Sequence, residues 1–319
     1  MARTLADRKP SIVRVIGHGS SDAAAAFAVY AFGLLPGWTA VRDSISLLVY
    51  YEAHIDLTDS AVVALSQSGR TPDVVSYVER ARAQGALTIA LTNEPESDLA
   101  AAAEIALPLA AGIERSVAAS KTYVNTLAAL ALLSGACAER ERETAAALRA
   151  VAELLATNLD ALEQSVAEVA LAFAYVGRMY VTGRGIEIAT TRELALKLKE
   201  TCRIAAEPLT ATDLVHGPVA TLDALFPVWV VASRDAGLQA VLDAAQRARA
   251  ANATLVASGS AAGEVAGAPY VLPVPQPPMP LLAPLLSIVP GQLFAAMLAR
   301  AKGLDPDHPE GLTKVTLAR

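Results

Sequence analysis

Short runs of aliphatic and β-branched residues alternate with alanine-rich segments along most of the chain. Runs of this length between helical segments predict buried strands of a parallel sheet, with the helices as crossover connections. The first half carries such runs at 12–16, 61–65, 87–91 and 105–109, and the second half at 179–182, 228–232, 254–257 and 270–274. The pattern therefore predicts an α/β protein built from doubly wound, flavodoxin-like units with three layers, α/β/α.

The two halves repeat one arrangement of turns and serines. A Gly-x-Gly turn follows the first run of each half, at 17–19 and at 183–185. Ser66 lies 49 residues after the first glycine of its half, and Ser233 lies 50 residues after the corresponding glycine. A tandem duplication explains both spacings more simply than coincidence. The predicted organisation is a first domain at 1–150, a second domain at 151–300 and a C-terminal tail at 301–319.

Composition restricts the class of protein. Hydrophobic residues make up 54% of the chain and charged residues 18%, which is enough apolar material for two packed cores. The net charge of −6 argues against a nucleic-acid partner, because such a partner requires a concentrated basic surface. The charged N-terminus does not fit a signal peptide, and Cys137 and Cys202 indicate no disulfide framework. We therefore expect a cytoplasmic protein.

One long segment, 265–299, contains no charged residue. Prolines recur through it from Pro269 to Pro290, so it cannot form one continuous membrane-spanning helix. We expect a strand, a proline-rich loop and a core helix at about 281–300, with no association with a membrane.

The segment 66–71 lies between a predicted strand and a helix that starts near Pro72. Its hydroxyl groups and backbone N–H groups would converge on the helix N-terminus, where the helix dipole favours an anion. An ordinary helix cap needs only one such residue, so three hydroxyl-bearing residues favour a phosphate site. The polar residues of this loop are Ser66, Gln67, Ser68 and Thr71, and Ser20 and Ser21 would supply a second wall.

A group of charged residues lies on the predicted helix at about 191–200. Glu193, Lys197 and Glu200 are spaced i, i+4 and i+7, and therefore share one helix face. This spacing favours a structural ion-pair ladder. It also fits a carboxylate that transfers protons beside a cation.

Two further residues, His216 and Lys314, are candidates for function, but their own sequence surroundings do not assign them a role. His216 precedes Gly-Pro and would present its imidazole at a turn, either in a cleft or as a surface or capping residue. Lys314, near the C-terminus, would be an idle surface residue on composition alone. The four histidines show no metal-ligand spacing, and no cysteine joins them, so we expect no metal site and no cofactor.

Taken together, these segments resemble the sugar isomerase (SIS) domain family. The resemblance is greatest to the isomerase half of glucosamine-6-phosphate synthase and covers about 13–316. The matching pieces are 19–21, 66–71, 117–121, 195–200, 216–218 and 312–314. Each piece is moderately specific, whereas their combination is highly specific.

The resemblance implies a role for each site residue. Glu200 would move a proton between C1 and C2 of an open-chain sugar, and Lys197 would stabilise nearby charge. His216 would open the sugar ring and would come from the neighbouring subunit, so the active sites of a homodimer would be shared. Lys314 would lie on a tail that closes over the site. The sugar phosphate would be bound by Ser20, Ser21, Ser66, Gln67, Ser68, Thr71 and Val117.

The resemblance also implies the reaction class and its alternatives. The synthases carry a glutaminase domain ahead of the isomerase half, and we expect that domain to be absent here because 12–16 already forms the first strand. Segments 68–73 and 112–121 look more like the stand-alone deaminases and deglycases than like the synthase. The leading hypothesis is a deaminase/isomerase that converts glucosamine-6-phosphate, or a close relative, to fructose-6-phosphate and ammonia, with a reversible reaction as one form of this hypothesis. The alternatives are a fructosamine-6-phosphate deglycase, a plain aldose–ketose isomerase, and a sensor that binds a sugar phosphate without turnover.

Overall fold

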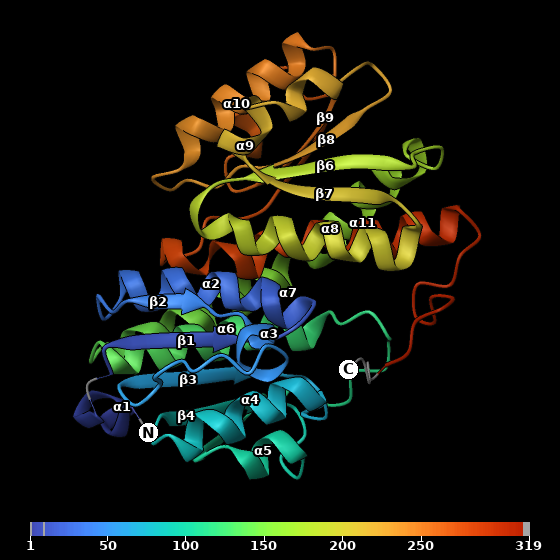
Figure 1. The fold of residues 1–319 in the computed structure, drawn as a ribbon. Coiled ribbons are helices and arrows are strands. Elements are labelled where there is room, and N and C mark those ends of the chain that lie inside the picture. Colours follow the sequence, from blue (N-terminus) through green and yellow to red (C-terminus); the bar gives the residue numbers. More distant parts are fainter. Residues whose placement is uncertain (1, 9, 315–319) are drawn as a thin grey trace. The chain divides into compact units, whose positions relative to one another are not determined.

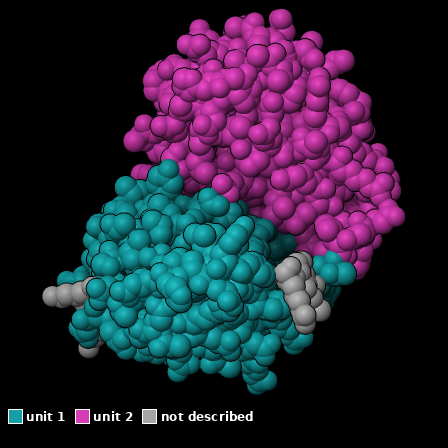
Figure 2. Space-filling model, viewed as in Figure 1, with its two compact units in different colours: residues 1–115, 119–145, 313–319 teal, residues 116–118, 146–312 magenta. Residues whose placement is uncertain are grey.

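The computed structural model describes residues 2–8 and 10–314, which belong to two compact units. Unit 1 comprises 1–115, 119–145 and the chain end from 313, and unit 2 comprises 116–118 and 146–312 (Figure 2). The chain leaves unit 1 for unit 2 within the helix α7, Glu141–Ala172. In each unit, helices cover a parallel sheet (Figure 1).

Unit 1 contains a five-stranded parallel sheet in the order β2-β1-β3-β4-β5. The strands are β1 (Ile12–Ile16), β2 (Ala40–Arg42), β3 (Ser60–Leu65), β4 (Leu87–Thr92) and β5 (Ile105–Pro108). The helices are α1 (Ala2–Arg8), α2 (Ser20–Leu34), α3 (Ile45–Val49), α4 (Pro72–Ala83), α5 (Asp98–Ala102) and α6 (Lys121–Cys137). Every residue of β3 and β4 is buried, as expected for central strands that are covered on both faces.

Unit 2 repeats this topology. Its strands are β6 (Arg178–Gly183), β7 (Ala205–Thr210), β8 (Pro227–Val231), β9 (Thr254–Gly259) and β10 (Tyr270–Pro273). Its helices are η1 (Gly185–Glu187), α8 (Ile188–Cys202), α9 (Ala211–Val215), η2 (Pro218–Thr221), α10 (Leu238–Ala250), η3 (Ala262–Glu264), η4 (Pro280–Leu282) and α11 (Ala283–Ala301). The sheet order β10-β9-β8-β6-β7, read from β7, matches that of unit 1 strand for strand. The predicted duplication and the doubly wound α/β fold class are thus confirmed.

The predicted strands are all present, with ends that differ by at most two residues, but the sequence pattern missed β2 and β7. Both are edge strands that pair with one neighbour only, β2 with β1 and β7 with β6. The strand β2 is three residues long, and β7 includes Glu207 and Pro208. Edge strands tolerate proline and charge, so they lack the continuous apolar run that identifies a central strand.

The predicted core helix near 281–300 is observed as η4 followed by α11. Among the described residues, Pro280–Ala301 is the one helical stretch long and apolar enough to cross a membrane, and most of its apolar part is buried inside the protein. Phe294 packs edge-on against Trp229, with ring centroids 4.9 Å apart. A Cβ atom on Gly291 would lie 2.8 Å from Leu194 Cδ1, so this glycine allows α11 to approach α8 closely. The contact fixes the helix that carries the candidate catalytic residues.

Candidate functional site

The loop 66–71 of unit 1 follows β3 at the carboxyl edge of the sheet and leads directly into α4. Gly69 N donates to Ser66 Oγ at 3.1 Å, and Ser66 Oγ lies 3.4 Å from Thr71 Oγ1. Thr71 occupies the N-cap position of α4, but its side chain makes no capping hydrogen bond. The hydroxyl groups therefore gather within the loop, beside a helix N-terminus, which is the arrangement that favours an anion over a simple cap.

Neighbouring elements hold this loop in place. The carbonyl of Gln67 accepts hydrogen bonds from Asn93 N at 3.1 Å and from Thr92 Oγ1 at 3.3 Å. Gly69 has a φ of +62°, and a Cβ atom there would collide with the Ser97 hydroxyl. Only glycine meets both requirements, because other L residues are strained at this φ. Sequence reasoning found the loop but not its supports, which lie in β4 and in the turn before α5.

The predicted second wall lies beside the loop. Ser20 and Ser21 begin α2, directly after the turn that follows β1. A Cβ atom on Gly17 would lie 3.0 Å from the Leu65 carbonyl oxygen and 2.7 Å from Ser21 Cβ. The absence of a side chain at Gly17 thus allows the turn after β1 to lie against the end of β3, where the loop 66–71 begins.

The charged residues of α8 form a buried cluster in unit 2. Lys197 Nζ lies 2.5 Å from Glu200 Oε2 and 3.5 Å from Glu193 Oε1. The side chains of Lys197 and Glu193 are 4% and 0% exposed, whereas that of Glu200 is 24% exposed. Burial lowers the pKa of Lys197, but the two carboxylates outweigh burial and the net pKa is raised. The lysine therefore remains an ammonium, and only one carboxylate of the cluster is open to solvent.

Glu200 lines a cavity of about 460 Å³ between the end of α8 and the segment 303–312. Arg203, which ends α8, forms an ion pair with Glu310 of that segment. Val117, which was predicted to contact the substrate, donates its backbone N–H to the Asp307 carbonyl at 2.9 Å. The structure thus places the predicted proton-transfer carboxylate at a cavity that could admit a small polar ligand.

The other two predicted catalytic residues lie elsewhere. His216 follows α9, is exposed, and does not line the cavity that contains Glu200. Lys314 belongs to unit 1 and lies near Glu114, whose Oε2 accepts a hydrogen bond from Thr122 N at 2.9 Å. Burial alone would raise the pKa of Glu114, but hydrogen bonds from Thr122 and the charge of Lys314 bring it below its ordinary value. Among the described residues, no group of three His, Cys, Asp or Glu side chains is placed to hold a metal ion.

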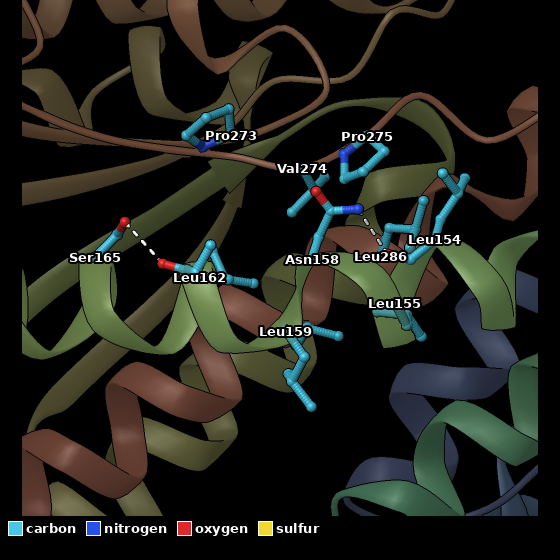
Figure 3. Close-up of a pocket in the computed structure, with 12 residues that line it drawn as sticks. Leu154, Leu155, Asn158, Leu159, Leu162, Ser165, Pro273, Val274, Pro275 and Leu286 are labelled. Atoms are coloured by element: carbon cyan, nitrogen blue, oxygen red, sulfur yellow. Dashed lines mark hydrogen bonds between the residues drawn. The ribbon is translucent and has the colours of Figure 1, made fainter.

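Unit 2 also contains an apolar groove of about 220 Å³ along α7 (Figure 3). Leucines from 154–162 line one side, and the strand end and loop at 273–275 line the other. No ionisable side chain lines this groove. It therefore offers no group for proton transfer, in contrast to the cavity at Glu200.

A buried carboxyl group that the sequence pattern did not reveal occupies unit 2 near Ser233, the counterpart of Ser66. Glu187 Oε1 accepts hydrogen bonds from Ser233 Oγ at 2.5 Å and from Ser287 Oγ at 2.8 Å, and Oε2 accepts one from Thr190 Oγ1 at 2.5 Å. Burial raises the pKa of Glu187, and the three hydroxyl hydrogen bonds oppose this rise. The second unit thus directs its hydroxyl groups at an internal carboxyl group.

Comparison with known proteins gives a consistent assignment. The isomerizing glutamine–fructose-6-phosphate aminotransferase of Gloeobacter violaceus is 36% identical over 263 residues, which cover 79% of this chain and 43% of that protein. A candidate phosphosugar isomerase from Silicibacter pomeroyi DSS-3 matches with a TM-score of 0.85 and 33% identity over 96% of this chain and 91% of that one. The C-terminal domain of glucosamine-fructose-6-phosphate aminotransferase from Francisella tularensis matches with a TM-score of 0.88 and 25% identity, covering 97% and 89%.

The curated relative is about twice as long as the part that this chain matches, whereas the two solved structures match along most of their length. The family model described as the SIS domain matches residues 5–134 and again residues 172–301, once in each half of the chain. Both sheets lie within these two matches. So do the loop 66–71 after β3, called the serine loop below, and Glu200 on α8. This chain therefore belongs to the SIS domain family, with two SIS domains in tandem.

Proposed function

We propose that this protein is a phosphosugar isomerase that acts on an amino-sugar 6-phosphate, with deamination as the outcome. Glucosamine-6-phosphate would yield fructose-6-phosphate and ammonia. The observation that carries the proposal is the cavity-lining carboxylate of Glu200, held at 2.5 Å by the buried ammonium of Lys197. A single carboxylate in this setting can accept a proton and return it to the neighbouring carbon.

The serine loop of unit 1 supports the phosphosugar class of substrate. The hydroxyl groups of Ser66, Ser68 and Thr71, together with backbone N–H groups at the start of α4, suit a phosphate. A phosphate anchored in this loop would fix one end of the sugar and limit the orientations that the rest of its carbon chain can adopt.

The proposed reaction balances without an external oxidant or reductant. Glu200 removes the proton from C2 of open-chain glucosamine-6-phosphate and gives an enolamine. The same carboxyl group returns the proton to C1; over the two steps the C1 oxygen gains a proton and the amino nitrogen loses one, which yields a hydroxymethyl group at C1 and an imine at C2. Water then adds to the imine carbon, the C–N bond breaks, and the ketose and ammonia are released. Lys197, which stays charged, supplies positive charge beside Glu200 during both transfers.

The remaining residues enter the proposal as predicted from the resemblance. His216 is exposed and lies apart from the cavity at Glu200, which agrees with a role in the site of a neighbouring subunit of a homodimer. Lys314 would act from the chain end. We also propose that the protein works in the cytoplasm.

The test is a substrate panel with two readouts. Purified full-length protein is incubated in D₂O with glucosamine-6-phosphate, fructosamine-6-phosphate or fructose-6-phosphate, and released ammonia and deuterium at C1 and C2 are measured. Glu200→Gln should abolish both signals, because an amide cannot accept the proton. Glu163→Gln, an exposed position on α7, is the matched control and should leave both signals unchanged.

Each outcome separates the candidate functions. Ammonia from glucosamine-6-phosphate supports the deaminase, ammonia-free deuterium exchange supports a plain isomerase, and release of an amino acid from a fructosamine-6-phosphate supports a deglycase. Binding of the sugar phosphates without exchange above the Glu200→Gln background would refute an enzymatic function and leave a sensor.

A further inference from the structure

The turn after β1 contains a histidine that the mechanism above does not use. His18 Nε2 lies 2.7 Å from Asp73 Oδ2, and Asp73 belongs to the first turn of α4. The pair therefore joins the loop after β1 to the helix that begins at the end of the serine loop 66–71. The strands β1 and β3, from which the two loops start, are adjacent in the sheet (Figure 1).

The imidazole is held on one side and open on the other. The side chain of Asp73 is only 10% exposed, whereas that of His18 is 55% exposed. Asp73 Oδ1 accepts from Val74 N at 2.9 Å, and Tyr50 Oη donates to Oδ2 at 3.4 Å, so the carboxylate is fixed from three directions. A fixed carboxylate that engages one ring nitrogen orients the ring and leaves the other ring nitrogen to face a ligand.

The serine loop offers neutral hydrogen-bond donors to an anion, and a positive charge beside them would strengthen the binding. Arg70, its cationic side chain, lines a groove between α4 and α5 together with Glu79 and Asp98. A phosphate at the N-terminus of α4 would also lie near the Asp73 carboxylate, and two negative groups at close range repel each other. A protonated His18 next to Asp73 removes this repulsion and adds a charged donor.

We propose that His18, as an imidazolium, contacts the substrate phosphate and supplies the positive charge of the binding site, with Asp73 as the positioning residue. The inference rests on the proposed function, because it requires the serine loop to bind phosphate. It adds a binding residue from the turn after β1 that neither the glycine pattern nor the family match assigned.

The test measures binding directly, so that it does not depend on turnover. Calorimetric titration of the full-length protein with inorganic phosphate and with glucosamine-6-phosphate gives Kd for the wild type, His18→Gln and His18→Arg. Loss of one charge-assisted contact should raise both Kd values by about tenfold or more in His18→Gln. His18→Arg, which keeps the charge, should remain within about threefold of the wild type. His54→Gln, at an exposed histidine of the same unit, should have no effect.

A spectroscopic measurement in the unmodified protein covers the case in which a variant does not fold. The chain has four histidines, so the imidazole ¹⁵N signals can be assigned by single substitutions at the other three. Added phosphate should shift the His18 signals towards the imidazolium pattern and leave those of His54 in place. Phosphate binding that is unchanged in His18→Gln, or unshifted His18 signals at saturating phosphate, would overturn the inference. No binding by the wild type would instead refute the proposed phosphate site itself.

Discussion

The buried carboxyl group of Glu187 makes a stringent test of the packing in unit 2. Replacement by alanine removes the acceptor for three hydroxyl groups, those of Ser233, Ser287 and Thr190. Glutamine keeps the size and one carbonyl acceptor, so Glu187→Gln isolates the effect of the acid from the effect of the volume.

The magnitude follows from the hydrogen bonds. A buried hydroxyl left without its partner costs about 1–3 kcal/mol. Ser233 and Ser287 can partly compensate, because their oxygens are already 3.2 Å apart. We expect Glu187→Ala to lower the free energy of unfolding of unit 2 by about 3 kcal/mol, and Glu187→Gln by about 1 kcal/mol, near pH 5.

The difference between wild type and Glu187→Gln should depend on pH. The pKa of Glu187 is raised in the folded protein above its ordinary value of 4.5, so the folded state binds this proton more tightly than the unfolded state. The contribution of this bound proton to the free energy of unfolding is fully present below pH 4.5 and is lost as the pH rises through the folded-state pKa. Glutamine does not titrate. The free energy of unfolding of Glu187→Gln, relative to that of the wild type, should therefore increase as the pH rises from 5 to 8, by at most about 1.4 kcal/mol per pH unit.

The assay is urea unfolding followed by Trp229 fluorescence in a Trp38→Phe background, because Trp229 is fully buried in unit 2. Glu168→Gln, at an exposed position on α7, is the control for removing a carboxylate. The reasoning is refuted if Glu187→Ala is as stable as this control, or if the gap between wild type and Glu187→Gln does not move between pH 5 and pH 8.

Two further predictions concern the proposed site. Gly69→Ala forces a Cβ atom into the Ser97 hydroxyl at a φ of +62°, so phosphate affinity by calorimetry should fall at least about tenfold; unchanged affinity would show that the loop does not bind the anion. Mixing inactive Glu200→Gln and His216→Gln chains should restore about a quarter of the wild-type activity if a homodimer shares its sites, whereas no recovery after verified subunit exchange would contradict sharing.

How much of this could be predicted from sequence depends on how local each feature is. The central strands and the loop 66–71 are contiguous in sequence, so their apolar runs and clustered hydroxyl residues identify them directly. The spacing of Glu193, Lys197 and Glu200 predicted a shared face and favoured a structural ion-pair ladder. The structure shows both ion pairs of Lys197 and, in addition, the burial of Lys197 and Glu193, which the spacing did not predict. The helix α8 also packs through Leu194 against Gly291 of α11, whose residues are far from α8 in the sequence, so the surroundings of α8 cannot be read from its own spacing.

The features that sequence reasoning missed depend on long-range contacts. Glu187 meets Ser233 and Ser287 across 46 and 100 residues, and no local pattern connects these positions. The sequence pattern placed His18 in the glycine turn after β1 but gave it no binding role, because its partner Asp73 is 55 residues away. The edge strands β2 and β7 were missed for the opposite reason, since the short sequence of β2 and the charge and proline of β7 carry too little local signal.

The path of the chain between the two units has a consequence for synthesis. Unit 1 includes the residues from 313 onward, and unit 2 includes 116–118, which are made long before the rest of that unit. During translation the sheet of unit 1 can form early, but Glu114 acquires the charge of Lys314 only after about 200 further residues have been synthesised. A nascent chain that does not yet extend to Lys314 would therefore hold a finished sheet in which Glu114 still lacks that charge.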